Sequence, residues 1–275
     1  MPGYDDLGTR MKTFYEQIPK IKLMRRTPVI VRIDGKAFHT FTKGFKRPFD
    51  EILIKTMQET TKYLCENIQG CVFGYTQSDE ISLILVDYKR LETSAWFDYE
   101  IQKMCSIAAS MATLAFNKFF EINKNEFADS ISHCSTMHSS EKSGQEYIDC
   151  LNKALEKGAM FDARVFNIPK EEVTNCIYWR QLDAYRNSIQ MVGQANFSHK
   201  ELQNKSCNAI QDMLMTQKNI DWNDYPTYQK VGSCVVKETY VENDVERSRW
   251  IIDKNIPLFK GEGREYIEKL IVADE

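Results

Sequence analysis

The stretch Val29–Phe41 has the sequence VIVRIDGKAFHTF, and it joins a run of β-branched apolar residues to an acidic turn. A second stretch, Gly74–Leu85 (GYTQSDEISLIL), places Asp79 and Glu80 before another apolar run. Short runs rich in Val, Ile and Leu predict buried strands, whereas Asp-Gly and Ser-Asp-Glu predict turns. The two stretches therefore predict a sheet that carries acidic side chains at the ends of two strands.

These acids have two possible explanations. They are ordinary turn residues, since Asp, Gly and Ser all favour turn conformations. Alternatively, Asp34 and Asp79 are carboxylates from separate strands that converge on divalent metals, as nucleotidyl and phosphoryl transfer requires. The flanks favour the second explanation, because a carboxylate at the tip of a buried strand such as Val29–Ile33 costs stability unless something compensates it. A metal ion is one such compensator.

The remaining pattern predicts alternating helices and strands around these two stretches. A helix at Asp5–Gln17 comes first, and a loop through Pro48 follows the first strand. Later elements are predicted at residues 50–67 (a helix capped by Asp50), 71–75 and 81–86 (strands), 94–120 (a helix) and 164–168 (a strand). This βαββαβ order predicts an α+β fold of the ferredoxin-like type, which is called a palm in nucleic-acid polymerases and nucleotide cyclases.

Three regions are expected from changes along the chain. Residues 1–28 form an N-terminal helical lead-in, and residues 29–170 form the palm. Within the palm, residues 123–145 are rich in Ser, Lys, Asn and Glu, which predicts a mobile insertion. Residues 171–275 form a C-terminal region packed on the palm. This region is expected to be helical to about Asp221, followed by a strand-like segment, VGSCVVKETYV, and a tail.

The composition is typical of a globular protein from a reducing compartment. The chain has 275 residues, of which 43% are hydrophobic and 27% charged, enough for one large domain or two closely packed lobes. It has no apolar stretch long enough to span a membrane, and its N-terminus lacks a signal-peptide core. Eight cysteines without a CxxC pair indicate free thiols, so we expect a cytoplasmic location.

The overall charge does not indicate a nucleic-acid binder, because the net charge is −3 and the pI is about 5.9. Basic residues are instead concentrated in two places. The first cluster precedes the first strand and comprises Lys20, Lys22, Arg25 and Arg26, and the second follows the RIDG motif and comprises Lys43, Lys46 and Arg47. Either cluster could contact phosphates. A solvated surface explains the first cluster at least as well, whereas the second lies beside the predicted metal site.

Four segments give a more specific indication: RIDGKAFHTF, GYTQSDEISL, FDARVFNIP and YWRQLDAYRNS. In this order they resemble the tRNA-His guanylyltransferase family and its bacterial and protist relatives, the Thg-one-like 3′-to-5′ nucleotide polymerases. The resemblance extends from about Val29 to about Gln194 and is weaker beyond. It implies an enzyme that adds nucleotides to the 5′ end of RNA, with tRNA and nucleoside triphosphates as partners and two Mg²⁺ ions as cofactors.

The resemblance also implies roles for individual residues. The catalytic acids would be Asp34 and Asp79, which hold Mg²⁺ with the Gly35 carbonyl, because Mg²⁺ prefers oxygen ligands. Glu80 completes the catalytic group, either as a secondary ligand or as a structural partner. The residues implied to bind ATP or GTP, as activating nucleotide and substrate, are Arg32, Asp34, Gly35, Lys36, Ala37, Phe38, His39, Arg47, Asp50, Ser78, Asp79, Lys103 and Arg164.

Some of these residues have a second explanation. Asp50 is either the cap of its helix or a reader of the N1 and N2 edge of guanine. Phe38 is as plausible in the core as in a base pocket. Arg32, Lys103 and Arg164 would be surface cations without the resemblance, and they would grip triphosphates with it.

The chain departs from the family pattern at three places. Members that specify tRNA-His carry His-Ile-Asn-Asn, a block associated with the histidine anticodon, where this chain has Tyr185–Ser188 (YRNS). Only Asn187 is retained, and with Arg186 it is a candidate RNA contact. Glu100 replaces a family arginine in the long helix, and Arg47 aligns with a family lysine only after a small gap. The first departure argues against an enzyme dedicated to tRNA-His.

The resulting prediction is a template-dependent 3′-to-5′ RNA nucleotidyltransferase that repairs 5′-truncated tRNA, assembled as a homotetramer by similarity to the family. The closest alternative is a tRNA-His guanylyltransferase that adds a single G, and a second is a nucleotide cyclase on the same palm. A third is a non-catalytic RNA-binding module, because βαββαβ is also the RRM order and Lys43-Gly44-Phe45 faintly resembles an RRM motif. Such a module would not need Asp34 or Asp79.

Overall fold

The computed structural model describes residues 6–132, 138–243 and 245–273. In this part of the chain the strands form one six-stranded sheet in which all neighbours are antiparallel. The strands are β1 (Val29–Gly35), β2 (Cys71–Gln77), β3 (Glu80–Leu85), β4 (Phe161–Asn167), β5 (Ser233–Glu242) and β6 (Val245–Asp253). Their order across the sheet is β4-β1-β3-β2-β5-β6. The mixed helix and strand content agrees with the prediction.

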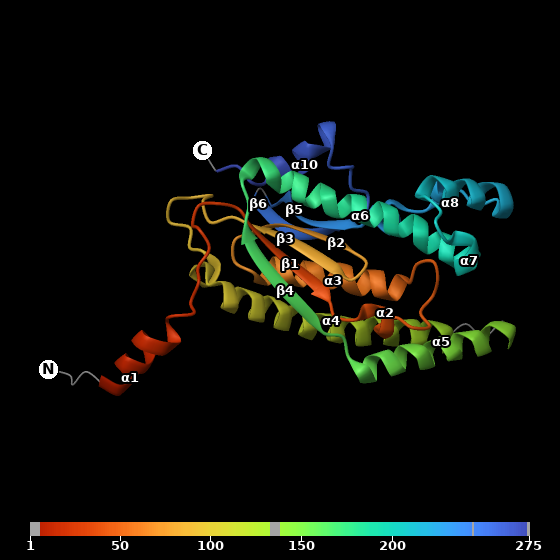
Figure 1. The fold of residues 1–275 in the computed structure, drawn as a ribbon, viewed down its shortest axis with the longest axis horizontal. Helices are drawn as coiled ribbons and strands as arrows, with labels where there is room; N and C mark the ends of the chain where they lie inside the picture. Colours follow the sequence, from red (N-terminus) through yellow and green to blue (C-terminus); the bar gives the residue numbers. More distant parts are fainter. Residues whose placement is uncertain (1–5, 133–137, 244, 274–275) are drawn as a thin grey trace.

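Helices lie on both faces of this sheet (Figure 1). The described α-helices are α1 (Asp6–Met11), α2 (Phe38–Phe41), α3 (Glu51–Asn67), α4 (Ile101–Ser132), α5 (His138–Lys157), α6 (Lys170–Asn196), α7 (His199–Leu202), α8 (Cys207–Met213), α9 (Thr227–Val231) and α10 (Glu265–Glu268). Short 3-10 or π segments occur at Lys12–Glu16, Trp96–Tyr99, Leu214–Lys218, Trp222–Asp224 and Gly261–Arg264.

The predicted βαββαβ order of β1, α3, β2, β3, α4 and β4 is present, with α2 as an additional helix between β1 and α3 and α5 between α4 and β4. β1 forms where β-branched residues follow one another, and Val29, Val31 and Ile33 are completely buried. α3 begins where predicted, because the Asp50 side chain accepts a hydrogen bond from the Leu53 amide at the free amino end of the helix.

Each face of the sheet has its own core. The face that carries Val31 and Leu83 packs against α3 and α4. The opposite face carries Ile30 and Ile84, and it packs against α6 and the C-terminal segment that includes Phe259. These two faces alternate along each strand, so neighbouring residues of β1 point into different cores.

α3 lies unusually close to β2, and Gly74 makes this approach possible. A Cβ atom at this position would lie 2.5 Å from the Cys65 sulfur and 2.9 Å from a Thr61 methyl group, both on α3. The close contact fixes α3 across the sheet, and the amino end of α3 therefore lies at the edge where β1 and β2 end.

The long helix and the expected insertion differ from the prediction. α4 starts at Ile101 rather than near Ser94, because Trp96–Tyr99 form a tight turn with positive φ angles that buries Trp96 and Tyr99. It continues to Ser132 rather than Phe120. Residues 123–145, expected to be mobile, belong to α4 and α5 wherever the structure describes them.

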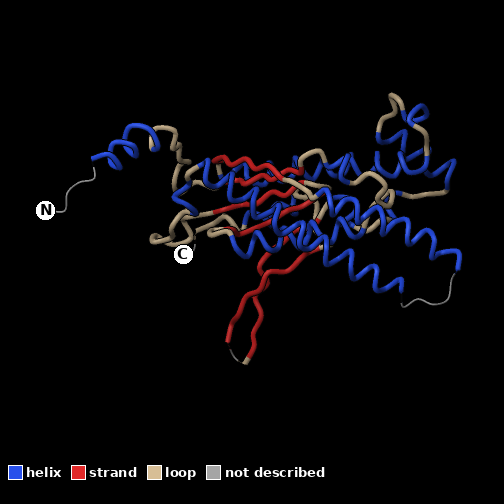
Figure 2. The backbone as a smooth tube through the Cα atoms, turned by 90° about the horizontal axis from the view of Figure 1, so that it is seen from below, coloured by secondary structure: helices blue, strands red, loops and turns tan. Residues whose placement is uncertain are grey.

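The C-terminal region contributes to the same sheet. β5 confirms the predicted strand-like segment, and it pairs with β2. The tail was not predicted to form a strand, yet β6 pairs with β5 along its length. Figure 2 shows this hairpin projecting from the body of the molecule. The predicted helical stretch to Asp221 is divided into α6, α7 and α8.

The N-terminal segment extends away from the sheet (Figures 1 and 2). α1 and the π segment that follows it agree with the predicted helix. Their apolar residues Leu7 and Phe14 are exposed, as is Ile18 in the turn after them. No helix in the described residues is long and apolar enough to cross a membrane.

Candidate active site

The two acidic stretches meet at one end of the central strands, where β1 stops and the β2–β3 turn lies. We call this end of the sheet the acidic edge. Asp34 is paired with Glu80 in the β1–β3 register, and the Gly35 amide donates a hydrogen bond to the Asp79 carbonyl at 3.1 Å. β1 ends at this edge, and the turn between β2 and β3 lies beside it. The sheet register therefore brings Asp34 and Asp79 together from separate strands.

The carboxylates of Asp34 and Asp79 lack compensating charge. Burial raises the pKa of Asp79, hydrogen bonds from the Ser78 hydroxyl and the backbone oppose this rise, and the negative charge of Asp34 adds to it. Within the described chain, no Lys or Arg forms an ion pair with either carboxylate. A bound cation would relieve this repulsion.

The donor set fits Mg²⁺ rather than a soft metal. Asp34 and Asp79 supply hard carboxylate oxygens, and the Gly35 carbonyl lies in the same turn. No group of three or more His, Cys, Asp or Glu side chains in the described residues could hold a metal by itself. Mg²⁺ usually keeps waters and binds substrate phosphates in addition to one or two carboxylates, and this small donor set is consistent with that habit.

Glu80 is held differently from Asp34 and Asp79, and its contacts favour the structural one of its two predicted roles. Its carboxylate accepts hydrogen bonds from Arg180 at 2.6 and 2.7 Å and from Arg32 at 3.3 Å. The residue is only 5% exposed, and burial raises its pKa although Arg180 opposes this rise. With both oxygens engaged by arginines, Glu80 is the structural partner that links the sheet to α6.

A pocket of about 610 Å³ opens beside the acidic edge. Predicted nucleotide-binding residues that line it are Gly35, Ala37, Phe38, His39, Arg47, Asp50, Ser78 and Asp79. All three residues of the second basic cluster, Lys43, Lys46 and Arg47, also line this pocket. Met191 and Gln194 of α6 complete the lining. The pocket lining therefore combines Asp79 with three cations, and Asp34, which precedes Gly35 of the lining, is not itself part of it.

Phe38 contributes to the core as well as to the pocket. Its ring is 5% exposed and packs against Phe41, Phe116 and Phe161, with ring centroids 5.1–5.5 Å apart. A Cβ atom at Gly35 would lie 2.3 Å from this ring. Gly35 is therefore needed so that the loop can close over Phe38.

The remaining predicted nucleotide contacts do not line the pocket. Lys36 has an exposed side chain, and its amide donates to the Met160 carbonyl at 2.8 Å. Arg32 pairs with Glu80 and lies over the Trp179 ring. Arg164 is exposed on the edge strand β4, 3.6 Å from Asp162.

Lys103 lies in the first turn of α4, far from the acidic edge. Its ammonium group lies over the Phe97 ring. Thr113, ten residues further along α4, accepts a hydrogen bond from the amide of Phe161, which is paired with Gly35. Ten helical residues span about 15 Å. Lys103 therefore lies about 15 Å along α4 from the level of Gly35, and its contact with a triphosphate stays a prediction.

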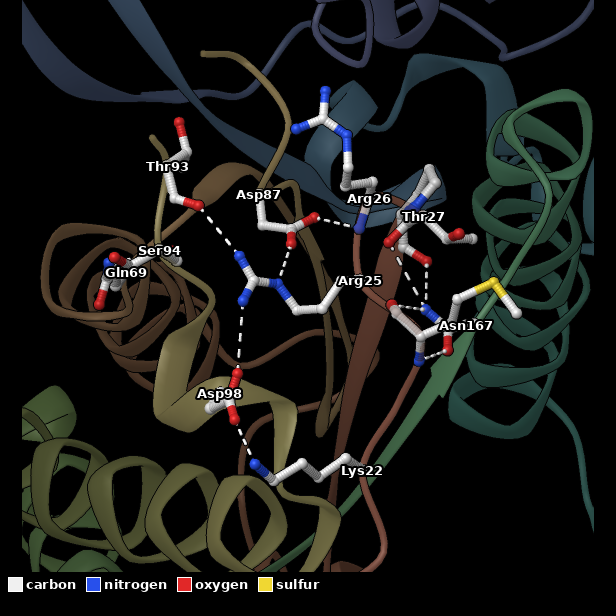
Figure 3. Close-up of polar contacts among 12 residues, drawn as sticks. Lys22, Arg25, Arg26, Thr27, Gln69, Asp87, Thr93, Ser94, Asp98 and Asn167 are labelled. Carbon is white, nitrogen blue, oxygen red and sulfur yellow. Dashed lines mark hydrogen bonds and ion pairs between the residues drawn. The ribbon is translucent and has the colours of Figure 1, made fainter. Parts of the chain in front are cut away.

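The first basic cluster has an architectural role (Figure 3). Arg25 donates to Asp87, to Asp98 and to the Thr93 carbonyl, and the Arg26 amide also donates to Asp87. Lys22 pairs with Asp98. These contacts join the segment before β1 to the turns that precede α4. They lie at the Val29 end of β1, away from Asp34.

Comparison with known proteins agrees with this geometry. A family model described as tRNAHis guanylyltransferase matches residues 8–169, more than half of the chain. The chain belongs to the tRNAHis guanylyltransferase family. It is therefore a nucleotidyltransferase, as predicted.

Individual relatives cover most of the chain. A bacterial tRNA(His) guanylyltransferase-like protein in complex with ATP is 43% identical with a TM-score of 0.79, covering 97% of this chain and 99% of that one. A bacterial protein of the same description in complex with GTP is 40% identical with a TM-score of 0.74 and the same coverage. The tRNA(His) guanylyltransferase of Debaryomyces hansenii is 26% identical over 229 residues, 78% of this chain and 76% of the relative.

The segment Tyr185–Ser188, where this chain differs from the family block, packs through its first and last residues and exposes the two between them. The Tyr185 ring packs on Trp222 at 4.8 Å between centroids, and the Ser188 hydroxyl accepts a hydrogen bond from the Trp222 indole at 3.2 Å. Arg186 is exposed and pairs with Asp183. Asn187 is exposed and lines a smaller pocket of about 80 Å³ beside Asp50 and Ser78.

Several residues at or beside this site of the tRNAHis guanylyltransferase family chain were not predicted from its sequence. Arg180 lies inside the quoted segment YWRQLDAYRNS, so the resemblance contained its signal. Gln194 and Met191 of α6 have no distinctive signal. Tyr147 lies just beyond the predicted insertion at residues 123–145, in a stretch for which no element was predicted, although Tyr147, Leu151 and Ala154 recur at helical spacing.

Proposed function

We propose that this chain is a template-dependent 3′-to-5′ RNA nucleotidyltransferase that repairs the 5′ ends of truncated tRNAs. One observation carries the proposal: Asp79, an uncompensated carboxylate that feels the charge of the nearby Asp34, lines a pocket whose wall also carries Lys43, Lys46 and Arg47. Such a pocket suits the triphosphate of a nucleotide, because the cations match its charge and the acids match the divalent ions that accompany it. The bacterial relatives that bind ATP and GTP support this assignment.

In the proposed reaction, the 3′-hydroxyl of an incoming nucleotide attacks the activated 5′ phosphorus of the RNA. A new P–O bond forms, and pyrophosphate leaves from a 5′-triphosphate, or AMP leaves from a 5′ end that ATP has activated. Asp34, Asp79 and the Gly35 carbonyl would hold two Mg²⁺ ions, which when bound acidify the hydroxyl and neutralise the leaving group. The chain itself would orient the triphosphate with Lys46 and Arg47 and donate a hydrogen bond from Ser78.

Template dependence follows from what the site lacks. Tyr185 and Ser188 contact Trp222, so they occupy the position of the anticodon-associated block without its side chains. Arg186 and Asn187 are exposed, and Asn187 lines the smaller pocket beside Asp50 and Ser78, so both would be available to contact RNA. Selection of the nucleotide would then rest on pairing with the opposite RNA strand.

We also propose a palm fold for the catalytic region, a homotetrameric assembly and a cytoplasmic location. The order β4-β1-β3-β2 supports a ferredoxin-like palm at residues 29–170, with residues 171–275 packed on it. A homotetramer is proposed by similarity to the family, and the exposed apolar residues Leu7, Phe14 and Ile18 offer a surface for assembly. A cytoplasmic location would give access to tRNA.

The direct test is incubation of the protein with tRNAs that lack one to three 5′ nucleotides and with labelled nucleoside triphosphates. Products resolved on a sequencing gel should grow to the length of the template and contain the complementary nucleotides. A matched tRNA whose template position is mutated should incorporate the new complement. Addition of G alone, whatever the template base, would contradict the proposal.

The second candidate is a tRNA-His guanylyltransferase that adds a single G, and the printed function of relatives such as the Debaryomyces hansenii protein favours it. Exchange of anticodons between tRNA-His and another tRNA, both lacking the first nucleotide, separates the two candidates. A loss of kcat/KM of about a hundredfold, or ~2.7 kcal/mol, on removal of the histidine anticodon would support this candidate. The repair enzyme should change less than about threefold.

A further inference from the structure

α5 reaches the pocket wall through one buried tyrosine. The Tyr147 hydroxyl donates a hydrogen bond to Asp50 Oδ2 at 2.5 Å. The same oxygen accepts from the Lys46 amide at 3.0 Å, and Oδ1 accepts from the Leu53 amide at 3.0 Å. Asp50 is 5% exposed and Tyr147 8% exposed, so these bonds are shielded from water.

The Tyr147 ring also contacts the side chain of Lys46. The Lys46 ammonium lies 4.5 Å from the centroid of the Tyr147 ring and 4.5 Å from that of Phe127. The two rings meet edge to face, with centroids 5.3 Å apart. An ammonium group that contacts two aromatic rings is restrained in position. Phe127 of α4 and Tyr147 of α5 thus form one aromatic corner against which a pocket cation packs.

Lys46 and Asp50 line the pocket, whereas Tyr147 does not. Any effect of Tyr147 on a nucleotide must therefore pass through these two residues. Burial raises the pKa of Tyr147, and the charge of Asp50 adds to this, so the hydroxyl remains a donor at neutral pH. Both hydrogen bonds to Oδ2 use acceptor positions that the N1–H and N2–H groups of guanine would need.

We propose that Tyr147 is a positioning residue for nucleotide binding, which fixes the Lys46–Asp50 wall of the pocket and keeps Asp50 from reading the base. This inference rests on the proposed function, because it takes the ligand to be a nucleoside triphosphate. It gives the segment between α4 and β4 a role in the site. It also explains how a pocket of this shape accepts more than one base.

The test is Tyr147→Phe, which removes the hydroxyl and keeps the ring beside Lys46. KM for ATP and for GTP should rise about five- to tenfold, the size of one lost hydrogen bond of a positioned group, while kcat and KM for RNA stay within about twofold. The rise should be smaller for GTP, because guanine can use the acceptor that Tyr147 releases. Binding of a fluorescent ATP analogue, measured without RNA, should weaken by the same factor as KM for ATP.

The matched control is Tyr266→Phe. Tyr266 also donates to a carboxylate, Asp253, at 2.6 Å, but it contacts Phe73 and Phe259 on the face of the sheet covered by α6, outside the pocket. It should lower thermal stability as Tyr147→Phe does and leave KM unchanged. Phe127→Leu, which removes one of the two rings that Lys46 contacts and spares the hydrogen bond, should raise KM for both nucleotides equally.

Two outcomes separate the inference from the proposed function. Unchanged nucleotide affinity in Tyr147→Phe, or the same loss in Tyr266→Phe, would overturn the positioning role. If the wild-type protein binds the ATP analogue but adds nothing to truncated tRNA, the proposed reaction is wrong, and the affinity of Tyr147→Phe for the analogue still decides the positioning role.

Discussion

The two ends of the central strands differ in whether their acidic side chains have cationic partners. At the end shown in Figure 3, Arg25 contacts both Asp87 and Asp98, and Lys22 pairs with Asp98. At the other end, Asp34 and Asp79 have no cationic partner in the described chain, and their mutual repulsion helps to raise the pKa of Asp79. The acids at the first end are paired with cations of the protein itself, whereas those at the second are free to bind a cation from solution.

This difference separates residues that build the fold from residues that serve chemistry. Buried polar groups with partners add stability or specificity, whereas like charges held together without a partner cost stability and indicate function. Glu80 is the informative intermediate case. It lies beside Asp79, yet its pairing with Arg180 assigns it to the architectural class.

The largest expected effect tests the unpaired end. Asp34→Ala or Asp79→Ala should lower kcat at least about a thousandfold, equivalent to ~4 kcal/mol of transition-state stabilisation, because each removes a ligand for Mg²⁺. The melting temperature should not fall. Activity is measured with labelled nucleotide and truncated tRNA, and Asp98→Ala at the opposite end is the control. Near-normal turnover in either site variant would mean that the acids are ordinary turn residues.

The next effect tests Glu80. Glu80→Gln leaves Arg180 buried with reduced compensation, and it should lower the free energy of unfolding by about 3 kcal/mol. Glu238→Gln is the matched control, because Glu238 also accepts two hydrogen bonds from an arginine, Arg249, but on an exposed surface. The control should cost less than about 1 kcal/mol in urea unfolding. Equal costs would remove the distinction between a buried link and a surface pair.

A smaller loss of stability is expected at the paired end. Asp87→Ala removes the acceptor for the Arg25 side chain and the Arg26 amide, and it should lower the free energy of unfolding by roughly 2 kcal/mol. Arg25 is half exposed and can be solvated, which limits the cost. Nucleotide addition below the melting temperature should stay within about twofold of wild type. A selective loss of activity without a loss of stability would show that this end also serves the reaction.

The smallest effect is a dependence on pH. Because the folded-state pKa of Asp79 is raised, the folded protein binds more protons than the unfolded chain between the two pKa values, so stability falls as pH rises through that window. Asp79→Asn removes this dependence. Without divalent cations it should be the more stable protein at neutral pH, and its advantage should shrink as pH approaches the ordinary Asp value of about 4. Parallel stability curves for the two proteins would show that Asp79 is not strained.

The sequence predicted the fold where apolar spacing was strong. β1, α3, β2 and β3 were recognisable because β-branched runs and a capped amphipathic helix depend on near neighbours. β6 was missed because its exposed residues, such as Arg247 and Arg249, lack apolar alternation. α5 was missed because its buried positions are few and lie in a polar segment.

The site was predictable only in part, for a related reason. Asp34 and Asp79 follow from strand ends, which are local features. Glu80 and Arg180 are 100 residues apart, so nothing in the local pattern indicates that they meet.

The pairing of β2 with β5 has a consequence for how the protein is made. Ser233 follows Gln77 by 156 residues, and its hydroxyl accepts a buried hydrogen bond from Gln58 of α3. At 5–20 residues per second, a ribosome needs roughly 8–30 s to supply the missing strand. During that interval β2 is an open edge next to the turn that carries Asp79, and open edges invite pairing with other chains. The nascent chain can therefore cover the strand beside its candidate active site only late, after most of the protein has been synthesised.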